Sequence, residues 1–245
     1  MNLLLLGKGK TGSLVAEVAR KKGHSATALG SSENPHGRAL SADALREVDV
    51  IIDFTNPEAA LANIRAWLAA CKSGARAAMV VGATGWYAAL PEIRNEVEQA
   101  GGGFLYASNF SIGVNIFFEI ARAAAPALAH GYEVRIMERH HAQKKDAPSG
   151  TALAIRDRLQ PEVARAPAGG GSTEPAEKKP IEITSIREGD AVGQHVVLID
   201  GPSDTMMLVH DAKSRRAFAE GALLAAEWIK GKRGVFTFAD VLRKA

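Results

Sequence analysis

The chain has 245 residues, of which 47% are hydrophobic and 23% charged, a composition typical of a globular protein of one or two domains. Its formal net charge is only +3, which argues against a nucleic-acid-binding protein and suits a small anionic ligand. A single cysteine, Cys71, excludes an intrachain disulfide, and the apolar run Leu3–Leu6 is too short for a signal peptide or a membrane span. We therefore expect a cytoplasmic protein with no nucleic-acid or membrane partner.

The first half of the chain alternates strand and helix patterns. Residues 3–6 form an apolar run typical of a buried strand, and an amphipathic helical stripe over 14–19 follows and ends at Gly23. Asn56-Pro57 predicts the start of a second helix, because these residues suit the cap and the first helical position. Further strands are expected at 48–54, 77–81 and 104–107, and a further helix at 91–100. Repeated strand–helix units predict an α/β fold with a doubly wound parallel sheet.

The second half has a different pattern. After an apolar helix near 114–125, strands are expected at 132–139, 181–187, 194–199 and 205–210. Few helical patterns separate them, so they predict an α+β domain with an open antiparallel or mixed sheet. Residues 161–180 are rich in Pro, Gly, Ala and Glu without periodicity, and we interpret them as a long mobile loop. The chain ends with a helix near 216–230, an apolar run at 235–238 and a short helix.

The segment Gly7-Lys8-Gly9-Lys10-Thr11-Gly12 matches the GxGxxG pattern of dinucleotide sites. Alone the pattern is weak, but here it follows a predicted strand and opens a predicted helix, which is the context that such a site requires. Gly7 suits the tight turn, Gly9 allows the backbone to approach a pyrophosphate, and Gly12 allows close helix–strand packing. The helix N-terminus then offers N–H groups to phosphates. The alternative is a glycine turn without a ligand.

The loops after the later strands are expected at the same edge of the sheet, where ligands of open α/β sheets bind. Two loops are predicted to contact the nicotinamide side of a cofactor: Gly82, Ala83 and Thr84 after one strand, and Ala107, Ser108, Asn109 and Phe110 after the next. Asp53 ends another strand, and the sequence leaves open whether it is a ligand contact or only a turn and cap residue.

The residues that would select the cofactor follow the second strand, near residue 30. No acid stands directly at the strand end, where it would repel the 2′-phosphate of NADPH. Ser31 and Ser32, with Lys8 or Lys10 nearby, suit that phosphate, whereas Glu33 suits the ribose hydroxyls of NADH. We therefore expect NADPH, or dual use of NADPH and NADH.

The densest set of proton donors and anion-holding groups lies in Glu138–Thr151. His140 follows alternating strand positions, and an imidazole suits proton transfer near neutral pH. Lys144 adds a charge that suits a carboxylate and can also donate a proton. Ser149-Gly150-Thr151 opens a predicted helix whose backbone N–H groups suit an anionic substrate.

This segment has two other interpretations. Adjacent residues of a strand point to opposite sides, so His140 and His141 are poorly placed to bind one metal, and no other spacing indicates zinc. We therefore predict no metal site. The remaining alternative is an exposed polar connection between a strand and a helix, in which Asp146 and Pro148 serve only as cap and turn former.

These segments together closely resemble one family, the 4-hydroxy-tetrahydrodipicolinate reductases, also called dihydrodipicolinate reductases. The matching landmarks are Gly7–Gly12, Asp53–Thr55, Gly82–Gly85, Ser108–Asn115, Glu138–Thr151, Arg187–His195 and His210–Arg215. The resemblance implies a Rossmann-type dinucleotide-binding domain over 1–108, completed by 213–245, and a substrate-binding and oligomerisation domain over 109–212 of a homotetramer. It also implies NAD(P)H-dependent reduction of 4-hydroxy-tetrahydrodipicolinate to tetrahydrodipicolinate in the diaminopimelate route of lysine biosynthesis.

The resemblance assigns a role to each matching residue. His140 falls on the family's proton donor and acceptor, and Lys144 falls on its proton donor. The substrate carboxylates are expected to meet His141, Lys144, Ser149, Gly150 and Thr151, and the cofactor is expected to meet the three loops Gly7–Gly12, Gly82–Thr84 and Ala107–Phe110, with Ser31 beside them.

The chain also departs from the family pattern. Its glycine loop is one residue shorter than the common form, and Ser31-Ser32 stand where many members have an acid followed by a base. Ala83 stands where Thr is usual. The competing hypotheses are a reductase of another small dicarboxylate and a non-catalytic nucleotide-binding homologue with an assembly role. The presence of both His140 and Lys144 argues against the second.

Overall fold

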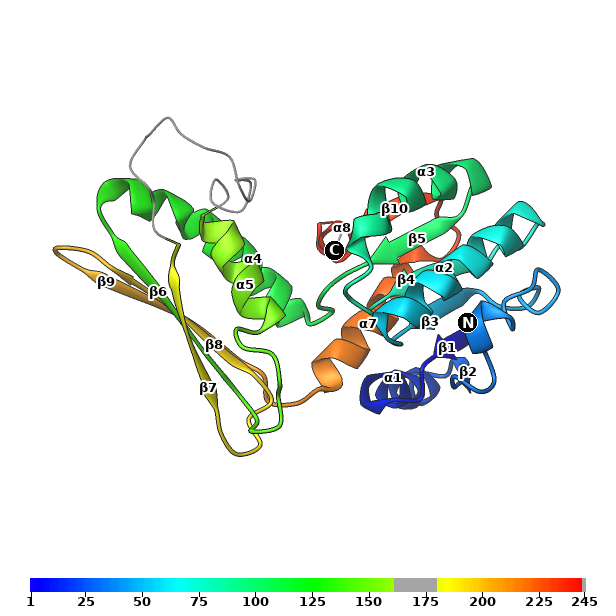
Figure 1. Ribbon diagram of the computed structural model, residues 1–245, viewed down its shortest axis with the longest axis horizontal. Coiled ribbons are helices and arrows are strands. Elements are labelled where there is room, and N and C mark those ends of the chain that lie inside the picture. The colour runs from blue at the N-terminus through cyan, green and yellow to red at the C-terminus, as the bar shows by residue number, and fades with distance from the viewer. Residues whose placement is uncertain (161–179, 244–245) are drawn as a thin grey trace. The chain divides into compact units, whose positions relative to one another are not determined.

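The computed structural model describes residues 1–160 and 180–243, and the chain divides into two compact units (Figure 1). The first unit comprises Met1–Ile112 and Arg215–Ala245, and the second comprises Gly113–Ser214. The loop expected over 161–180 lies outside the described residues, apart from Pro180.

The first unit is built on a six-stranded sheet in the order β10-β5-β4-β3-β1-β2, in which every neighbouring pair is parallel. The strands are β1 (Asn2–Leu6), β2 (Ser25–Leu29), β3 (Val50–Asp53), β4 (Ala78–Val81), β5 (Gly103–Tyr106) and β10 (Gly234–Thr237). The helices are α1 (Lys10–Lys21), α2 (Pro57–Lys72), α3 (Leu90–Ala100), α7 (Arg216–Ile229) and α8 (Phe238–Leu242), with short 3-10 turns η1 (Pro35–Gly37) and η2 (Tyr87–Ala89). The predicted doubly wound parallel sheet is confirmed.

Helices cover both faces of this sheet because successive strand residues enter two separate apolar cores. Leu3 and Leu5 pack in a core with α1, α7 and α8, whereas Leu4 and Leu6 pack in a second core with α2 and α3. A strand covered on both sides is mostly apolar: Val50, Ile51 and Ile52 of β3 are buried, and Asp53 at the end of the strand is also buried.

The predicted start of α2 is confirmed by its capping contacts. Asn56 has an extended backbone and accepts a hydrogen bond from the N–H of Ala59 at 2.9 Å, and Pro57 is the first helical residue. Glu58 lies in the first turn, where a negative charge complements the helix dipole.

The second unit is a four-stranded mixed sheet in the order β7-β6-β8-β9. The strands are β6 (Glu133–His140), β7 (Glu182–Arg187), β8 (Gln194–Asp200) and β9 (Thr205–Asp211). β6 pairs parallel with β7 and antiparallel with β8, which confirms the expected mixed sheet. Two helices, α4 (Ile112–Ala124) and α5 (Gly150–Leu159), bury one face of the sheet, and the 3-10 turn η3 (Ala125–His130) follows α4.

The apolar run expected at 235–238 turns out to be the sixth strand of the first sheet. β10 pairs parallel with β5, so that Val235 lies opposite Phe104. This partner is more than a hundred residues earlier in the chain, and no local pattern identifies it.

One helical stretch, Ile112–His130, is long and apolar enough by length and composition to cross a membrane. Core helices of globular proteins meet the same criteria, and this stretch packs Val114, Phe117 and Phe118 into the core of the second unit.

Candidate active site

The carboxyl ends of the parallel strands lie in register along one edge of the first sheet. Leu6 pairs with both Leu29 and Asp53, Asp53 pairs with Val81, and Val81 pairs with Tyr106. The loops that follow these residues include all the segments predicted to contact a cofactor. The structure therefore brings these loops to the edge at which open α/β sheets bind their ligands.

The glycine loop has the geometry expected of a pyrophosphate cradle. Gly7 has φ +100, and a Cβ there would lie 2.7 Å from the carbonyl oxygen of Phe54. A Cβ on Gly12 would lie 2.0 Å from the carbonyl oxygen of Gly7, so close packing of α1 requires this glycine. Gly9 has no neighbour within 4 Å of a Cβ position, which leaves its backbone open to a ligand. Lys10 and Thr11 form the first turn of α1, whose start carries no side-chain cap.

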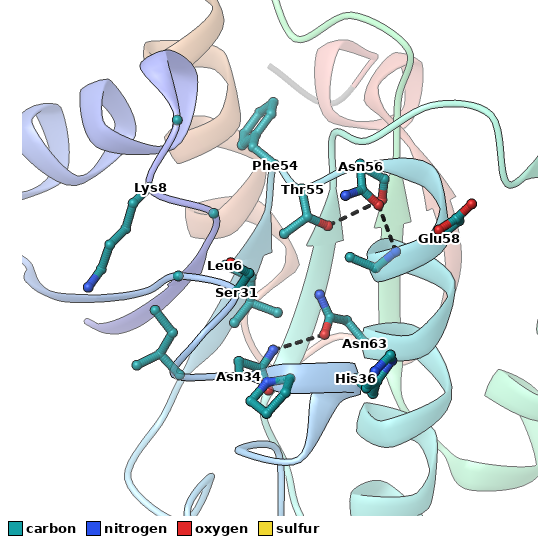
Figure 2. A pocket seen from close by; sticks show the side chains of 16 residues that line it. Leu6, Lys8, Ser31, Asn34, His36, Phe54, Thr55, Asn56, Glu58 and Asn63 are labelled. Carbon is teal, nitrogen blue, oxygen red and sulfur yellow. Dashed lines mark hydrogen bonds between the residues drawn. The ribbon is translucent and has the colours of Figure 1, made fainter.

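A cavity of about 520 Å³ opens beside this loop (Figure 2). Its lining includes Gly7, Lys8, Gly9 and Ser31 of the predicted set. It also includes residues that were not predicted as cofactor contacts, namely Asn34, His36, Phe54, Thr55, Asn56, Glu58 and Asn63. The size of the cavity and its glycine-rich wall fit part of a dinucleotide.

Asp53 is a structural residue, which decides between the two roles that the sequence left open. It is fully buried and accepts hydrogen bonds from the N–H and hydroxyl of Thr55, at 2.8 and 2.6 Å, and from Nδ2 of Asn63 at 2.8 Å. Asn63 in turn accepts a hydrogen bond from Asn34 at 2.9 Å (Figure 2). Burial raises the pKa of Asp53, although these hydrogen bonds act in the opposite direction. The network fixes the loops that form the cavity wall.

An acid does reach the end of β2, although none stands there in the sequence. The Glu33 carboxylate turns back to accept a hydrogen bond from the N–H of Gly30 at 2.7 Å and pairs with Nζ of Lys8 at 2.5 Å. The bond to Lys8 lowers the pKa of Glu33. Both side chains are about half exposed, so the pair is available to a ligand.

The two loops expected on the nicotinamide side follow β4 and β5. The ring of Phe54 covers Gly82 so closely that a Cβ there would lie 2.2 Å from Cε1 of that ring. The side chains of Ala83 and Phe110 are buried, so these residues can offer a ligand only their backbone. Thr84 and Ser108 are exposed, and Ala107 and Asn109 are half-buried.

The second unit carries a row of polar side chains on the buried face of its sheet. Glu138 lies opposite Ser185 on β7 and His195 on β8, and His195 lies opposite His210 on β9. Directly opposed residues share a face, so these side chains form one cross-strand row. The row is unusual because Glu138 and His195 are buried in a region otherwise filled by apolar residues.

His140 lies two residues beyond Glu138 on the same face of β6, opposite Arg187 of β7. Its Nδ1 contacts Oε2 of Glu138, and Oε1 of Glu138 accepts a hydrogen bond from Nη2 of Arg187 at 2.7 Å. Burial lowers the pKa of His140, the charges of Lys144 and Arg187 lower it further, and Glu138 opposes these effects. The arrangement is that of a histidine whose protonation is governed by one buried carboxylate.

Lys144 lies in the loop after β6 and is held by its neighbour. Its Nζ donates to both carboxylate oxygens of Asp146, at 2.8 and 2.9 Å, and its side chain is 23% exposed. The Asp146 carboxylate therefore binds the predicted proton donor, a contact that the interpretation of Asp146 as only a cap did not include. His141 is half-buried and its carbonyl accepts a hydrogen bond from the N–H of Lys144 at 3.1 Å.

The predicted helix start at 149–151 is confirmed as the N-terminus of α5. Ser149 is the cap: its hydroxyl accepts from the N–H of Ala152 at 3.2 Å and bonds Nε2 of His195 at 3.2 Å. Ser149 is buried, so its hydroxyl serves the helix and His195. Gly150 is exposed with no neighbour within 4 Å of a Cβ position, and Thr151 is half-buried.

Glu138, His140 and His195 place possible metal-ligand atoms within 4.8 Å of one another. This group arises from cross-strand neighbours and not from the adjacent histidines considered above. Arg187 already pairs with the Glu138 carboxylate, and Lys144 also acts on His140, so two positive charges oppose a bound cation. The donor set fits proton transfer better than metal binding, and a site without metal stays our prediction.

Three residues around His140 were not predicted as site residues from the sequence, namely Glu138, Arg187 and His195. Glu138 had a local signal, since it lies two residues before His140 and therefore on the same face of a strand. Arg187 and His195 belong to a segment that matches the family, but no local pattern relates them to Glu138, because strand register brings them there.

A Rossmann sheet with an open glycine loop, combined with a histidine–lysine group at a helix start, defines the class of nicotinamide-dependent oxidoreductases. Comparison with known proteins specifies the family. The family model "Dihydrodipicolinate reductase, N-terminus" matches residues 1–110, and "Dihydrodipicolinate reductase, C-terminus" matches residues 113–242. The chain therefore belongs to the dihydrodipicolinate reductase family, as its sequence motifs predicted.

Individual relatives agree with this assignment. The 4-hydroxy-tetrahydrodipicolinate reductase of Christiangramia forsetii is 36% identical over 244 residues, which cover 99% of this chain and 98% of the relative. That of Laribacter hongkongensis is 39% identical over 209 residues, covering 81% and 74%. Among solved structures, the dipicolinate-bound dihydrodipicolinate reductase from Paenisporosarcina sp. TG-14 has a TM-score of 0.74 at 22% identity and covers 98% of this chain and 99% of that one, a likeness of fold.

Proposed function

We propose that this protein catalyses the NAD(P)H-dependent reduction of 4-hydroxy-tetrahydrodipicolinate to tetrahydrodipicolinate in the diaminopimelate route of lysine biosynthesis, in the cytoplasm. The observation that carries the proposal is the group formed by His140, its buried partner Glu138, which also binds the N–H of the α5 cap residue Ser149, and Lys144 in the loop that leads to α5. A cyclic dicarboxylate needs both anion-holding groups and proton donors, and this group supplies both.

The first unit would hold the cofactor, as the sequence predicted for 1–108 with 213–245. The open backbone at Gly9, the uncapped start of α1 and the cavity lined by Ser31 fit a dinucleotide. When bound, the nicotinamide supplies the hydride. The exposed Thr84 and the backbone of Ala107–Phe110 would contact its carboxamide side.

The second unit would hold the substrate, as the sequence predicted for 109–212. Gly150 and Thr151 present backbone N–H groups at the start of α5, where a carboxylate is favoured. Lys144 and His141 add a positive charge and a hydrogen-bonding ring beside it. His140 and Lys144 would transfer the protons that accompany reduction.

A coupled assay tests the function. A synthase would form the substrate from pyruvate and aspartate semialdehyde, and the oxidation of NADPH and of NADH would be followed separately. We expect turnover that depends on the synthase. No turnover with either dinucleotide would contradict the proposal and would favour a reductase of another dicarboxylate or a non-catalytic homologue.

We further propose that the protein accepts NADPH as well as NADH. Ser31 lines the cavity without a negative charge, and Lys8 can pair with a phosphate when it leaves Glu33. Ser31→Glu should therefore raise the Kd for NADPH relative to NADH by about 10-fold, the scale of one moderate charge interaction, and Glu33→Gln should change the ratio in the opposite direction.

Calorimetric titration of both dinucleotides would measure this ratio. Glu98→Gln, on the exposed side of α3, is a matched control that removes a charge away from the cavity. An unchanged ratio in both Ser31→Glu and Glu33→Gln would show that this loop does not read the 2′-phosphate.

We also propose that copies of the chain associate, as expected of a homotetramer, through the sheet face that α4 and α5 leave open (Figure 1). The register places Met137, Val196, Leu198, Met207 and Val209 together on that face. Met207 is 64% exposed and Val209 is 52% exposed, and such apolar patches mark association sites.

Met207→Glu should convert the oligomer to smaller species, because a carboxylate at the centre of an apolar contact must be desolvated. Sedimentation velocity would measure the change. Ile116→Glu, at an exposed apolar position of α4 that is not on this face, should leave the oligomer intact. If Met207→Glu sediments like the wild type, the open face is not the interface.

A further inference from the structure

The buried pair Glu138–Arg187 contacts His140 directly and is connected to Lys144 through Asp146, and His140 and Lys144 are the residues to which we assign proton transfer. Glu138 is fully buried and the Arg187 side chain is 17% exposed. Besides its bond to Arg187, Glu138 contacts Nδ1 of His140 and accepts a hydrogen bond from the N–H of Ser149 at 3.3 Å. One carboxylate thus connects the histidine, the guanidinium and the start of α5.

The contact with Glu138 determines which nitrogen of His140 faces the solvent. An ionised carboxylate can only accept hydrogen bonds, so the proton of the neutral ring must be on Nδ1. None of the described residues forms a hydrogen bond with Nε2 of His140. A Cβ at Gly193 would lie 3.0 Å from Nε2, so the absence of a side chain there keeps this atom uncovered.

Of the described groups that act on the pKa of His140, Glu138 is the one that favours the protonated form. Burial lowers the pKa of this histidine, and the charges of Lys144 and Arg187 act in the same direction. Both the charge of Glu138 and its hydrogen bond raise the pKa. Loss of the carboxylate would therefore lower the pKa of His140 further and disfavour its protonated, proton-donating form.

Arg187 extends the same connection to Lys144. Its Nη2 donates to the backbone carbonyl of Asp146 at 2.6 Å as well as to Glu138, and the Asp146 side chain binds Nζ of Lys144. Burial raises the pKa of Glu138, but the hydrogen bond and charge of Arg187 act against it, and the pKa lies below its ordinary value. A shift of the guanidinium would therefore disturb His140 and the lysine loop together.

We propose that Glu138 and Arg187 are positioning residues for the reaction: Glu138 holds the ring of His140 so that Nε2 meets the substrate, and Arg187 fixes the loop that carries Lys144. This inference rests on the proposed function, because it takes His140 and Lys144 as the residues that transfer protons. A positioning role of this pair differs from that of a merely structural ion pair, which could be replaced by any well-packed neutral pair.

The test combines two variants and two measurements. Glu138→Gln keeps the size and the hydrogen-bond acceptor but removes the charge, and Glu138→Gln/Arg187→Met removes both charges and so avoids an unpaired buried cation. NMR of isotope-labelled histidine in the substrate-free protein measures the pKa and tautomer of His140, and steady-state kinetics measures kcat and KM. Glu188→Gln is the matched control. Glu188 pairs with Arg139, the residue that follows Glu138 on β6.

We expect the pKa of His140 to fall in both Glu138 variants, and kcat to fall by about 10²-fold with KM little changed. Glu188→Gln should behave like the wild type. A double variant that folds and regains wild-type kcat would overturn the proposal, since the pair would then be structural only. An unchanged pKa of His140 in both Glu138 variants would overturn it as well. The NMR result needs no substrate, so it stands even if the coupled assay finds no turnover.

Discussion

His140→Ala and Lys144→Ala should each lower kcat/KM for the dicarboxylate by about 10²-fold or more, the usual scale for acid–base catalysis. The alanine at position 140 removes the ring whose Nδ1 is held by Glu138, and the alanine at 144 removes an ammonium held by Asp146. Both changes delete a proposed proton donor, one at the end of β6 and one in the loop after it, and leave the apolar core of the second unit untouched.

The design of this experiment can separate chemistry from folding. Lys145→Ala, at the exposed next residue, is a matched control that should retain wild-type rates. Thermal unfolding would show that each variant is folded. Since residues that act as a unit are not additive, the double variant should be little slower than the slower single variant. Wild-type-like rates in both single variants would refute the assigned roles.

The fold of the first unit was predictable because its signals are local. Each buried parallel strand is a continuous apolar run, and Asn56 and Pro57 mark a helix start within two residues. The position of β10 was not predictable, because an edge strand joins the sheet through pairing with residues far away in the chain. Sequence patterns determine which segments form strands more directly than they determine the neighbours of each strand.

The same distinction separates the predicted and the missed residues of the candidate site. His140, Lys144 and the start of α5 lie within one continuous segment, and their spacing carries the chemistry. Arg187 is 49 residues from Glu138, and only the parallel pairing of β6 with β7 brings them into contact. The sequence thus indicated His140 and Lys144 but not Arg187, the residue that pairs with the Glu138 carboxylate.

Glu33 shows a third limit, which concerns loops. Counting residues from the end of β2 predicted no acid at the strand end. A turn instead returns the Glu33 carboxylate to the N–H of Gly30, where it also meets Lys8. Hydrogen bonds of a side chain to its own loop backbone are not visible as a sequence period, so cofactor selectivity was the least predictable property.

His195 should make the protein sensitive to mild acid. This residue is 4% exposed, and burial lowers its pKa from 6.5 to about 4. The charges of His140, His210 and Lys144 lower it as well, whereas Glu138 opposes them. Because the unfolded chain takes up this proton more readily than the folded chain, the contribution of His195 to stability is present above pH 6.5 and is lost as the pH falls to about 4.

The expected size follows from that shift, at about 1.4 kcal/mol per pKa unit: a total of about 3 kcal/mol, of which about 2 kcal/mol is lost between pH 7.5 and 5. Urea unfolding at these two pH values would measure it. His195→Gln keeps a nitrogen near the hydroxyl of Ser149 but cannot titrate, so its free energy of unfolding should fall by about 2 kcal/mol less than that of the wild type. The free energy of unfolding of His130→Gln, at the exposed end of η3, should fall as much as that of the wild type. Equal losses in the wild type and His195→Gln would show that the acid sensitivity comes from other groups, such as His140 and His210, whose pKa values burial also lowers.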